Sequence, residues 1–132
     1  MRRLSVAGLV LLGLLGPTPY PKAQQVAVRK ITIVAERFSF TPSEIRVPRG
    51  TAVQLHIRSD DTMHGFRIVG RSVNILVPKR RQGEAVVYFE AMDTGRYEFE
   101  CSRLCGAGHN FMRGAIVVTD NPEDELDESV RQ

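Results

Sequence analysis

The sequence predicts an all-β domain, folded as a sandwich or a barrel of short strands. Three observations support this fold class: apolar and polar residues alternate over short stretches, Gly and Pro turn signals separate these stretches, and no segment shows a long helical period. The 132 residues are enough for one domain, and no internal repeat is visible. The apolar and charged contents, 42% and 25%, are ordinary for a soluble globular protein.

The first four expected strands lie in the first half of the chain. Residues 26–33 are rich in β-branched side chains, although the alternation slips once in the middle. The alternating aromatic residues of 38–40 follow, and Pro42 ends that run. Residues 45–47 alternate before a Pro-Gly turn, and residues 53–57 show the cleanest period of two.

The remaining expected strands are shorter. Residues 66–69 form a short apolar run, and 73–75 add a further short strand. Residues 85–89 are apolar before an Asp-Thr-Gly turn, and residues 97–99 alternate with glutamates. Residues 115–119 are expected to close the domain.

The N-terminus has the pattern of a secretory signal peptide, which we place at residues 1–23. Two arginines precede an apolar run at 4–15, and three prolines end it. The run is shorter than the roughly 20 residues that span a membrane. Cleavage is expected after Ala23. Because Pro21, two positions before Ala23, is an unusual residue there, an uncleaved anchor is the alternative. Both versions predict a periplasmic or other extracytoplasmic location, the second with membrane association.

Charge is unevenly distributed along the chain. The expected domain, residues 24–119, has 14 basic and 9 acidic residues, whereas the tail at 120–132 is acidic and expected to be disordered. A short helix over 122–130 is the alternative for the tail. The densest basic cluster, residues 79–81, is either a solvated loop or a docking patch for an acidic partner. No aromatic residues are interleaved with it, which argues against nucleic-acid binding.

The chemistry-bearing stretch is the predicted loop before the last strand. Cys101, Cys105, His109 and Met112 have the spacing C-x3-C-x3-H-x2-M. Thiolate and thioether sulfur select Cu(I), imidazole suits copper in either state, and the stretch lacks the carboxylates that hard cations prefer. Strands on both sides can fix such a loop around a metal. The sequence therefore favours a soft-metal site here.

Two further readings concern this site. His64 follows an expected strand and is placed on a loop, from which it can reach one end of the sandwich. A disulfide between Cys101 and Cys105 is the alternative to metal binding in an exported chain. That bridge would close a very short loop and gain little stability from it.

These residues lie within phrases that resemble the CuA-binding cupredoxin domain of cytochrome c oxidase subunit II, which nitrous-oxide reductase shares. The similarity spans residues 26–119. Its phrases are Phe38-Ser39-Phe40-Thr41-Pro42, Val47-Pro48-Arg49-Gly50, Met63-His64-Gly65-Phe66, and Cys101 to Met112 followed by Arg113-Gly114. The resemblance implies a cupredoxin-like Greek-key β-sandwich or barrel that transfers electrons through two copper ions and is not catalytic alone.

The resemblance also implies a set of metal ligands. They are His64, Cys101, Arg103, Cys105, His109 and Met112. The two cysteines would bridge both ions and each histidine would bind one. The thioether and the backbone carbonyl of Arg103 would be weak ligands.

The chain departs from the oxidase pattern at several points. Arg103 stands where the family usually has Glu, no Trp is present, and the two membrane helices typical of subunit II are missing. These differences favour a free-standing carrier or a divergent oxidase component. The expected partners are a redox donor and acceptor, such as a cytochrome c-like protein or an oxidase subunit. Membrane contact would come through an uncleaved leader or a partner complex.

Two other functions fit part of the sequence. An extracytoplasmic copper-delivery protein would use the same ligands but release the metal readily. A thiol oxidoreductase is less consistent, because it usually has C-x-x-C at a helix N-terminus. Of the nearby residues, we read His56 as exposed, Phe66 and Phe111 as packing around the site, and Asp60 and Asp61 as turn residues.

Overall fold

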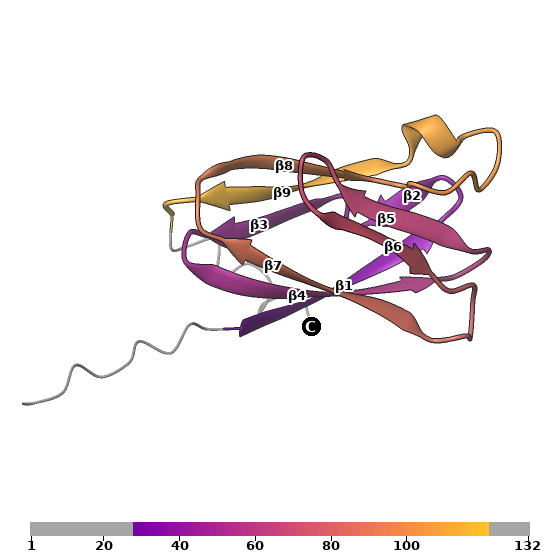
Figure 1. The fold of residues 1–132 in the computed structure, drawn as a ribbon, viewed down its shortest axis with the longest axis horizontal. Helices are drawn as coiled ribbons and strands as arrows, with labels where there is room; N and C mark the ends of the chain where they lie inside the picture. Colours follow the sequence, from indigo (N-terminus) through magenta and orange to yellow (C-terminus); the bar gives the residue numbers. More distant parts are fainter. Residues whose placement is uncertain (1–27, 122–132) are drawn as a thin grey trace, which may run out of the picture.

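The computed structural model describes residues 28–121, and this part is mostly β-structure (Figure 1). Its elements in chain order are β1 (Val28–Glu36), β2 (Ser39–Thr41), β3 (Glu44–Pro48), β4 (Thr51–Ser59), β5 (His64–Ile68), β6 (Val73–Val77), β7 (Glu84–Ala91), β8 (Gly95–Glu100), the 3-10 helix η1 (His109–Phe111) and β9 (Arg113–Thr119). The all-β prediction is confirmed. No helix in the described range has the length and apolar character needed to cross a membrane.

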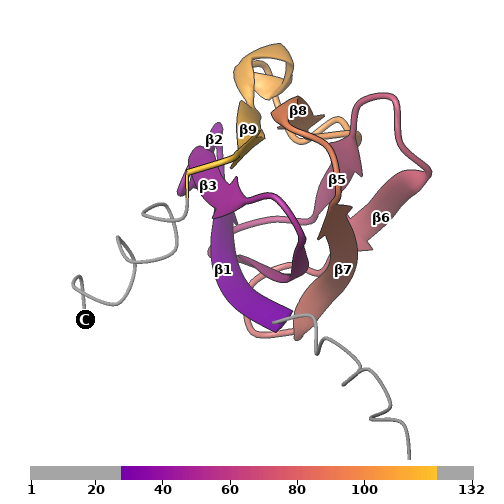
Figure 2. The same cartoon turned by 90° about the vertical axis from the view of Figure 1, so that its left-hand side faces the viewer.

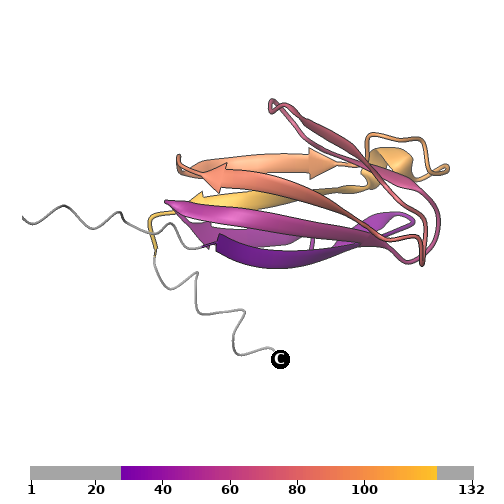
Figure 3. The same cartoon turned by 60° about the horizontal axis from the view of Figure 1, so that its bottom comes forward.

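The strands form two sheets that pack face to face (Figure 3). One sheet has the order β2-β1-β4-β7 and the other the order β3-β9-β8-β5-β6. Two neighbouring pairs are parallel, β1 with β4 and β3 with β9, and the remaining pairs are antiparallel. Parallel neighbours cannot be joined by a tight hairpin, so the chain crosses between the sheets and ties the sandwich together.

Alternation along the strands builds the core between the sheets. In β4, Val53, Leu55 and Ile57 point inward and are at most 1% exposed, while the residues between them face outward. Burying side chains of this kind contributes about 1.5–3 kcal/mol each. The view along the strands in Figure 2 shows the sheets curving around this interior.

An aromatic cluster fills the core. Phe40, Phe66 and Phe99 are buried, with ring centroids 5.0–5.7 Å apart and mostly edge-to-face contacts. Aromatic pairs in this geometry add about 0.5–1.5 kcal/mol beyond the area they bury. Phe66 lies in β5, which begins at His64, and Phe99 lies in β8, which ends directly before Cys101. The cluster therefore fixes two strands next to predicted ligands.

The structure refines the predicted elements. Most strands are longer than the alternation alone indicated, and His64 is the first residue of β5 and not part of a loop. The predicted signal peptide at 1–23, the start of the predicted domain at 24–27 and the alternative helix at 122–130 lie outside the described residues. Of the predicted tail at 120–132, only the first two residues are described.

Candidate metal centre

The predicted ligand loop closes one end of the sandwich. Residues 101–112 connect β8 to β9 at the right-hand end of Figure 1. The backbone N–H of Cys101 donates to the carbonyl of Met112 at 3.0 Å, which joins the two ends of the loop. Within it, η1 supplies one tight turn that carries His109. The loop is therefore anchored by the sheet on both sides.

Two glycines allow the loop to approach its neighbours closely. A Cβ atom on Gly65 in β5 would lie 2.8 Å from the backbone nitrogen of Arg103. Gly106 has a φ of +144°, and a Cβ there would lie 2.9 Å from the ring of Phe38. Such contacts are too short for a side chain, so glycine is required where the loop passes β5 and Phe38.

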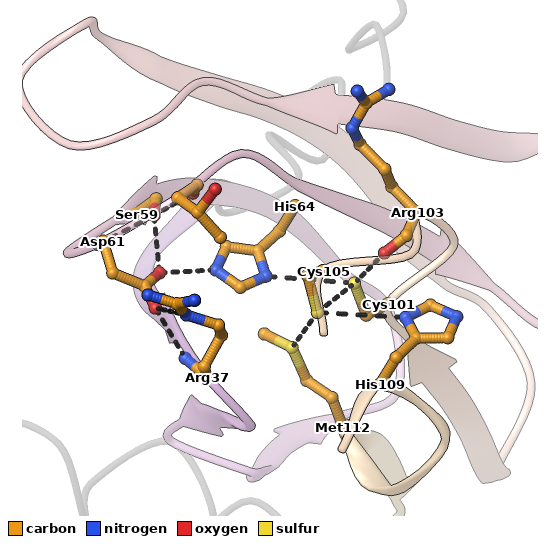
Figure 4. A network of polar contacts seen from close by, with 10 residues as sticks. Arg37, Ser59, Asp61, His64, Cys101, Arg103, Cys105, His109 and Met112 are labelled. Atoms are coloured by element: carbon orange, nitrogen blue, oxygen red, sulfur yellow. Dashed lines mark hydrogen bonds and ion pairs between the residues drawn. The ribbon is translucent and has the colours of Figure 1, made fainter. Parts of the chain in front are cut away.

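Four predicted ligands form a row across the site (Figure 4). Nδ1 of His64 lies 3.9 Å from Sγ of Cys101, which lies 3.7 Å from Sγ of Cys105. Sγ of Cys105 in turn lies 3.9 Å from Nδ1 of His109. The two sulfur atoms occupy the centre of the row, and one imidazole lies on each side.

Two weaker donor atoms complete the cluster. Sδ of Met112 lies 3.9 Å from Sγ of Cys105, and the carbonyl oxygen of Arg103 accepts from Sγ of Cys101 at 3.1 Å. The structure thus brings together all six residues of the predicted ligand set.

The donor set fits copper in both chemistry and spacing. The facing atoms are two thiol sulfurs, two imidazole nitrogens, one thioether and one carbonyl oxygen, which are soft or borderline donors. Bonds from a metal to N or S measure about 2.0–2.3 Å, so two atoms that share one ion lie roughly 3.5–4 Å apart. Donor atoms of His64, Cys101 and Cys105 all lie within 4.8 Å of one another.

Burial divides the cluster into a covered side and an open side. His64 and Met112 are 0% exposed and Cys101 is 4% exposed. Cys105 and His109 are half-buried. The His109 side of the site is therefore the side nearer to solvent.

Asp61 orients the buried imidazole, a role that the sequence did not reveal. Its Oδ1 lies 2.7 Å from Nε2 of His64, while its Oδ2 accepts from both the backbone N–H and Nε of Arg37. Burial raises the pKa of the Asp61 carboxyl, but the hydrogen bonds from His64 and Arg37 outweigh this and lower it well below its usual range. An ionised carboxylate only accepts, so Nε2 carries the proton. Nδ1 then presents its lone pair to Cys101.

The cysteines lack the features of a redox-active thiol pair. Both are free, and burial followed by the hydrogen bond with Cys101 raises the pKa of the Cys105 thiol to about 11. Reactive cysteines have a lowered pKa instead. In the metal-free protein Cys105 is therefore a protonated thiol, which argues against the oxidoreductase reading.

Predictions for the surrounding residues had mixed outcomes. His56 is outside the cluster, but it is half-buried and paired with Glu84 at 2.6 Å, so the prediction of an exposed residue was wrong. Phe66 is buried as expected. No residue of η1 is buried, and Phe111 is 83% exposed, so the prediction that it packs around the site was wrong.

Comparison with known proteins gives the family. The protein-family model described as a cupredoxin-like domain matches residues 5–118 of this chain. The chain belongs to the cupredoxin-like family. This agrees with the fold and with the resemblance carried by the metal loop.

Two relatives of this cupredoxin are cytochrome c oxidase subunits. The chain is 34% identical over 91 residues to cytochrome c oxidase subunit 2 of Thermus thermophilus, covering 68% of this chain and 65% of that protein. A second subunit 2 from Thermus thermophilus is also 34% identical over 91 residues, with 52% of its length covered. The chain thus spans between half and two thirds of these relatives.

A solved structure supports the same fold. The periplasmic domain of subunit II of cytochrome oxidase from Bradyrhizobium japonicum superposes with a TM-score of 0.65 at 22% identity. The superposition covers 83% of this chain and 96% of that domain.

Proposed function

We propose that this cupredoxin transfers electrons through a binuclear, CuA-type copper site. The proposed ligands are His64, Cys101, the carbonyl of Arg103, Cys105, His109 and Met112. The observation that carries the proposal is the row of two central sulfurs flanked by two imidazoles, with Sγ atoms 3.7 Å apart. Relatedness to cytochrome c oxidase subunit 2 supports a role in copper-related electron transfer.

Each residue has a distinct task in this proposal. Two copper ions bound here would take up one electron and share it. Cys101 and Cys105 would hold the ions as bridging thiolates, and each histidine would hold one of them through Nδ1. Asp61 holds the ring of His64 in the required tautomer. Because His64, Cys101 and Met112 are buried and lie in or next to strands, the site should change little in shape when its charge changes.

The decisive experiment is reconstitution of the reduced protein with copper. Two coppers per chain, with paramagnetic hyperfine splitting from two equivalent nuclei, are the expected result. One copper per chain with splitting from a single nucleus would contradict the binuclear site and favour a blue-type centre.

Copper delivery is the second candidate function, because it could use the same donor atoms. A delivery protein must release its metal readily, whereas His64, Cys101 and Met112 are at most 4% exposed. This burial favours retention. Exchange of bound copper with a chelator distinguishes the two functions: release within seconds supports delivery, and retention over hours supports electron transfer.

The relatives also support a proposal for the physiological setting. The proposed location is periplasmic or otherwise extracytoplasmic, as in the Bradyrhizobium domain. The proposed partners are a cytochrome c-like donor and an acceptor in a terminal oxidase. The protein would act as a free carrier or as a subunit-II-like component, and it would not be catalytic alone.

A further inference from the structure

An exposed apolar patch lies beside the proposed metal ligands. Leu104, which directly precedes Cys105, is 81% exposed, and Leu76 in β6 is 58% exposed. Single exposed leucines are common on protein surfaces. These two, however, lie 28 positions apart in the chain and line one hollow of about 600 Å³.

A second hollow continues from the first toward the metal centre. The first hollow is lined by Asn74, Ile75, Leu76, Ser102, Arg103 and Leu104. Ser102 also lines the second one, of about 310 Å³, which reaches Cys101 and His109. The two hollows together form a surface route from the leucines to proposed copper ligands. A partner seated here would approach the centre from its more exposed side.

The walls of both hollows are basic. Arg103 lines the first, and Arg67 and Arg113 line the second. Glu100 is the acidic residue between the latter two: it pairs with Arg67, and one of its oxygens lies 3.7 Å from Nε of Arg113. One carboxylate therefore faces two guanidinium groups, and the surface keeps a positive surplus.

The basic cluster at residues 79–81 lies at the same end of the molecule. The backbone N–H of Arg80 donates to the carbonyl of Asp61 at 3.2 Å, which holds the loop between β6 and β7 against the β4–β5 connection. Within the described part of the chain, neither Arg103 nor Lys79, Arg80 and Arg81 form an ion pair.

Two carboxylates at this end are neutralised by arginines, in the pairs Asp60 with Arg58 and Asp61 with Arg37. Glu84 contacts only the imidazole of His56, and Glu36, at the end of β1, is an exposed carboxylate without an ion-pair partner among residues 28–121. Four unpaired cations against these two carboxylates still leave the end positive.

We propose that this surface, defined here as the docking face (Leu76, Leu104, Arg103 and residues 79–81), binds an acidic redox protein. This inference rests on the proposed electron-transfer function and specifies its partner. The apolar leucines exclude water where the two proteins meet, and the surrounding cations attract and orient a partner with an acidic rim around its redox centre. The electron leaves the reduced centre of one protein and reduces that of the other, and no bond forms or breaks.

The test compares two partners that share one fold and one haem. A lysine-rich cytochrome c serves as the basic probe, and the same protein after succinylation of its lysines serves as the acidic probe. Each is mixed in its ferrous form with the copper-loaded protein, and the rate of haem oxidation is measured across a range of ionic strength. We expect the acidic probe to react at least about tenfold faster at low salt and to lose this advantage as salt increases.

Matched variants locate the effect on the molecule. Arg80→Glu should slow the acidic probe about threefold to tenfold at low salt. Lys30→Glu, the same charge reversal at an exposed position of β1, should change the rate far less. Leu76→Ser should slow the reaction at all salt concentrations. Val28→Ser, at a residue with a similar exposure of 62%, is its control.

An electrode measurement separates this inference from the function on which it rests. If the copper protein is reduced at an electrode but reacts equally with both probes, or faster with the basic one, the docking proposal is wrong and electron transfer stands. If it responds neither at the electrode nor to either probe, both are wrong. If sedimentation instead shows a dimer that Leu76→Ser dissociates, the docking face belongs to a second copy and the proposal is overturned.

Discussion

The carboxylate of Asp61 lies 2.7 Å from Nε2 of His64, and this contact directs Nδ1 of the same ring at Sγ of Cys101. His64 is fully buried and makes these two polar contacts on opposite sides of its ring (Figure 4). One short loop between β4 and β5 therefore fixes both the tautomer and the orientation of a proposed copper ligand.

The first prediction concerns this pair. Asp61→Ala removes the acceptor of Nε2, so the ring of His64 loses its orientation and its preference for the required tautomer. Loss of such a partner typically weakens metal binding about 10–100-fold. Competition with a chelator of known copper affinity measures the change.

The neighbouring carboxylate provides the control for this variant. Asp60 pairs with Arg58 and does not contact His64. Asp60→Ala should therefore bind copper nearly as the parent does. Equal copper affinity in the two variants would show that Asp61 does not position the ligand.

The strands could be predicted because their signal is local. In β4, alternation of Val53, Leu55 and Ile57 with polar residues assigns one face to the core without knowledge of any partner strand. The parallel pairing of β1 with β4 could not be predicted in this way. It depends on contacts between segments far apart in the chain, which period and propensity do not encode.

The candidate site likewise combines features that the sequence predicted with one that it did not. Its loop ligands share one short motif, so the sequence predicted that they would come together. The role of Asp61 depends on Arg37 and His64, which reach it from different parts of the chain, and no spacing pattern announces that contact. The prediction that Phe111 packs around the site failed, because the motif does not show whether an aromatic residue within it is buried or exposed.

The second prediction tests the bridging role of sulfur. Cys105→Ser replaces a thiolate donor by a hydroxyl that binds copper poorly, while the buried His64 and Cys101 remain. We expect about one copper per chain and hyperfine splitting from a single nucleus. Ser102→Ala, which removes only the hydrogen bond to Asn74, should keep two coppers. Splitting from two equivalent nuclei in Cys105→Ser would refute the bridging role.

The third prediction concerns the close approach of the loop to β5. In Gly65→Ala the new methyl group would meet the backbone nitrogen of Arg103 at 2.8 Å, so the loop must move. Overpacking of this kind costs about 1–3 kcal/mol of unfolding free energy, which urea denaturation of the metal-free protein measures. The displaced carbonyl of Arg103 should also alter the copper spectrum. An unchanged midpoint and spectrum would mean that the loop is not held against β5.

The fourth prediction compares two phenylalanines near the metal loop. The ring of Phe38 packs against the backbone at Gly106 and is 38% exposed, whereas Phe111 lies on the loop itself and is 83% exposed. Phe38→Ala should lower the free energy of unfolding by about 1–3 kcal/mol, less than a fully buried phenylalanine would. It should also speed copper loss to a chelator, because the loop that carries Cys105 loses its cover. Phe111→Ala should change stability by no more than about 0.5 kcal/mol. If both variants released copper at the parent rate, the strands alone would hold the loop in place and the packing of Phe38 would not contribute.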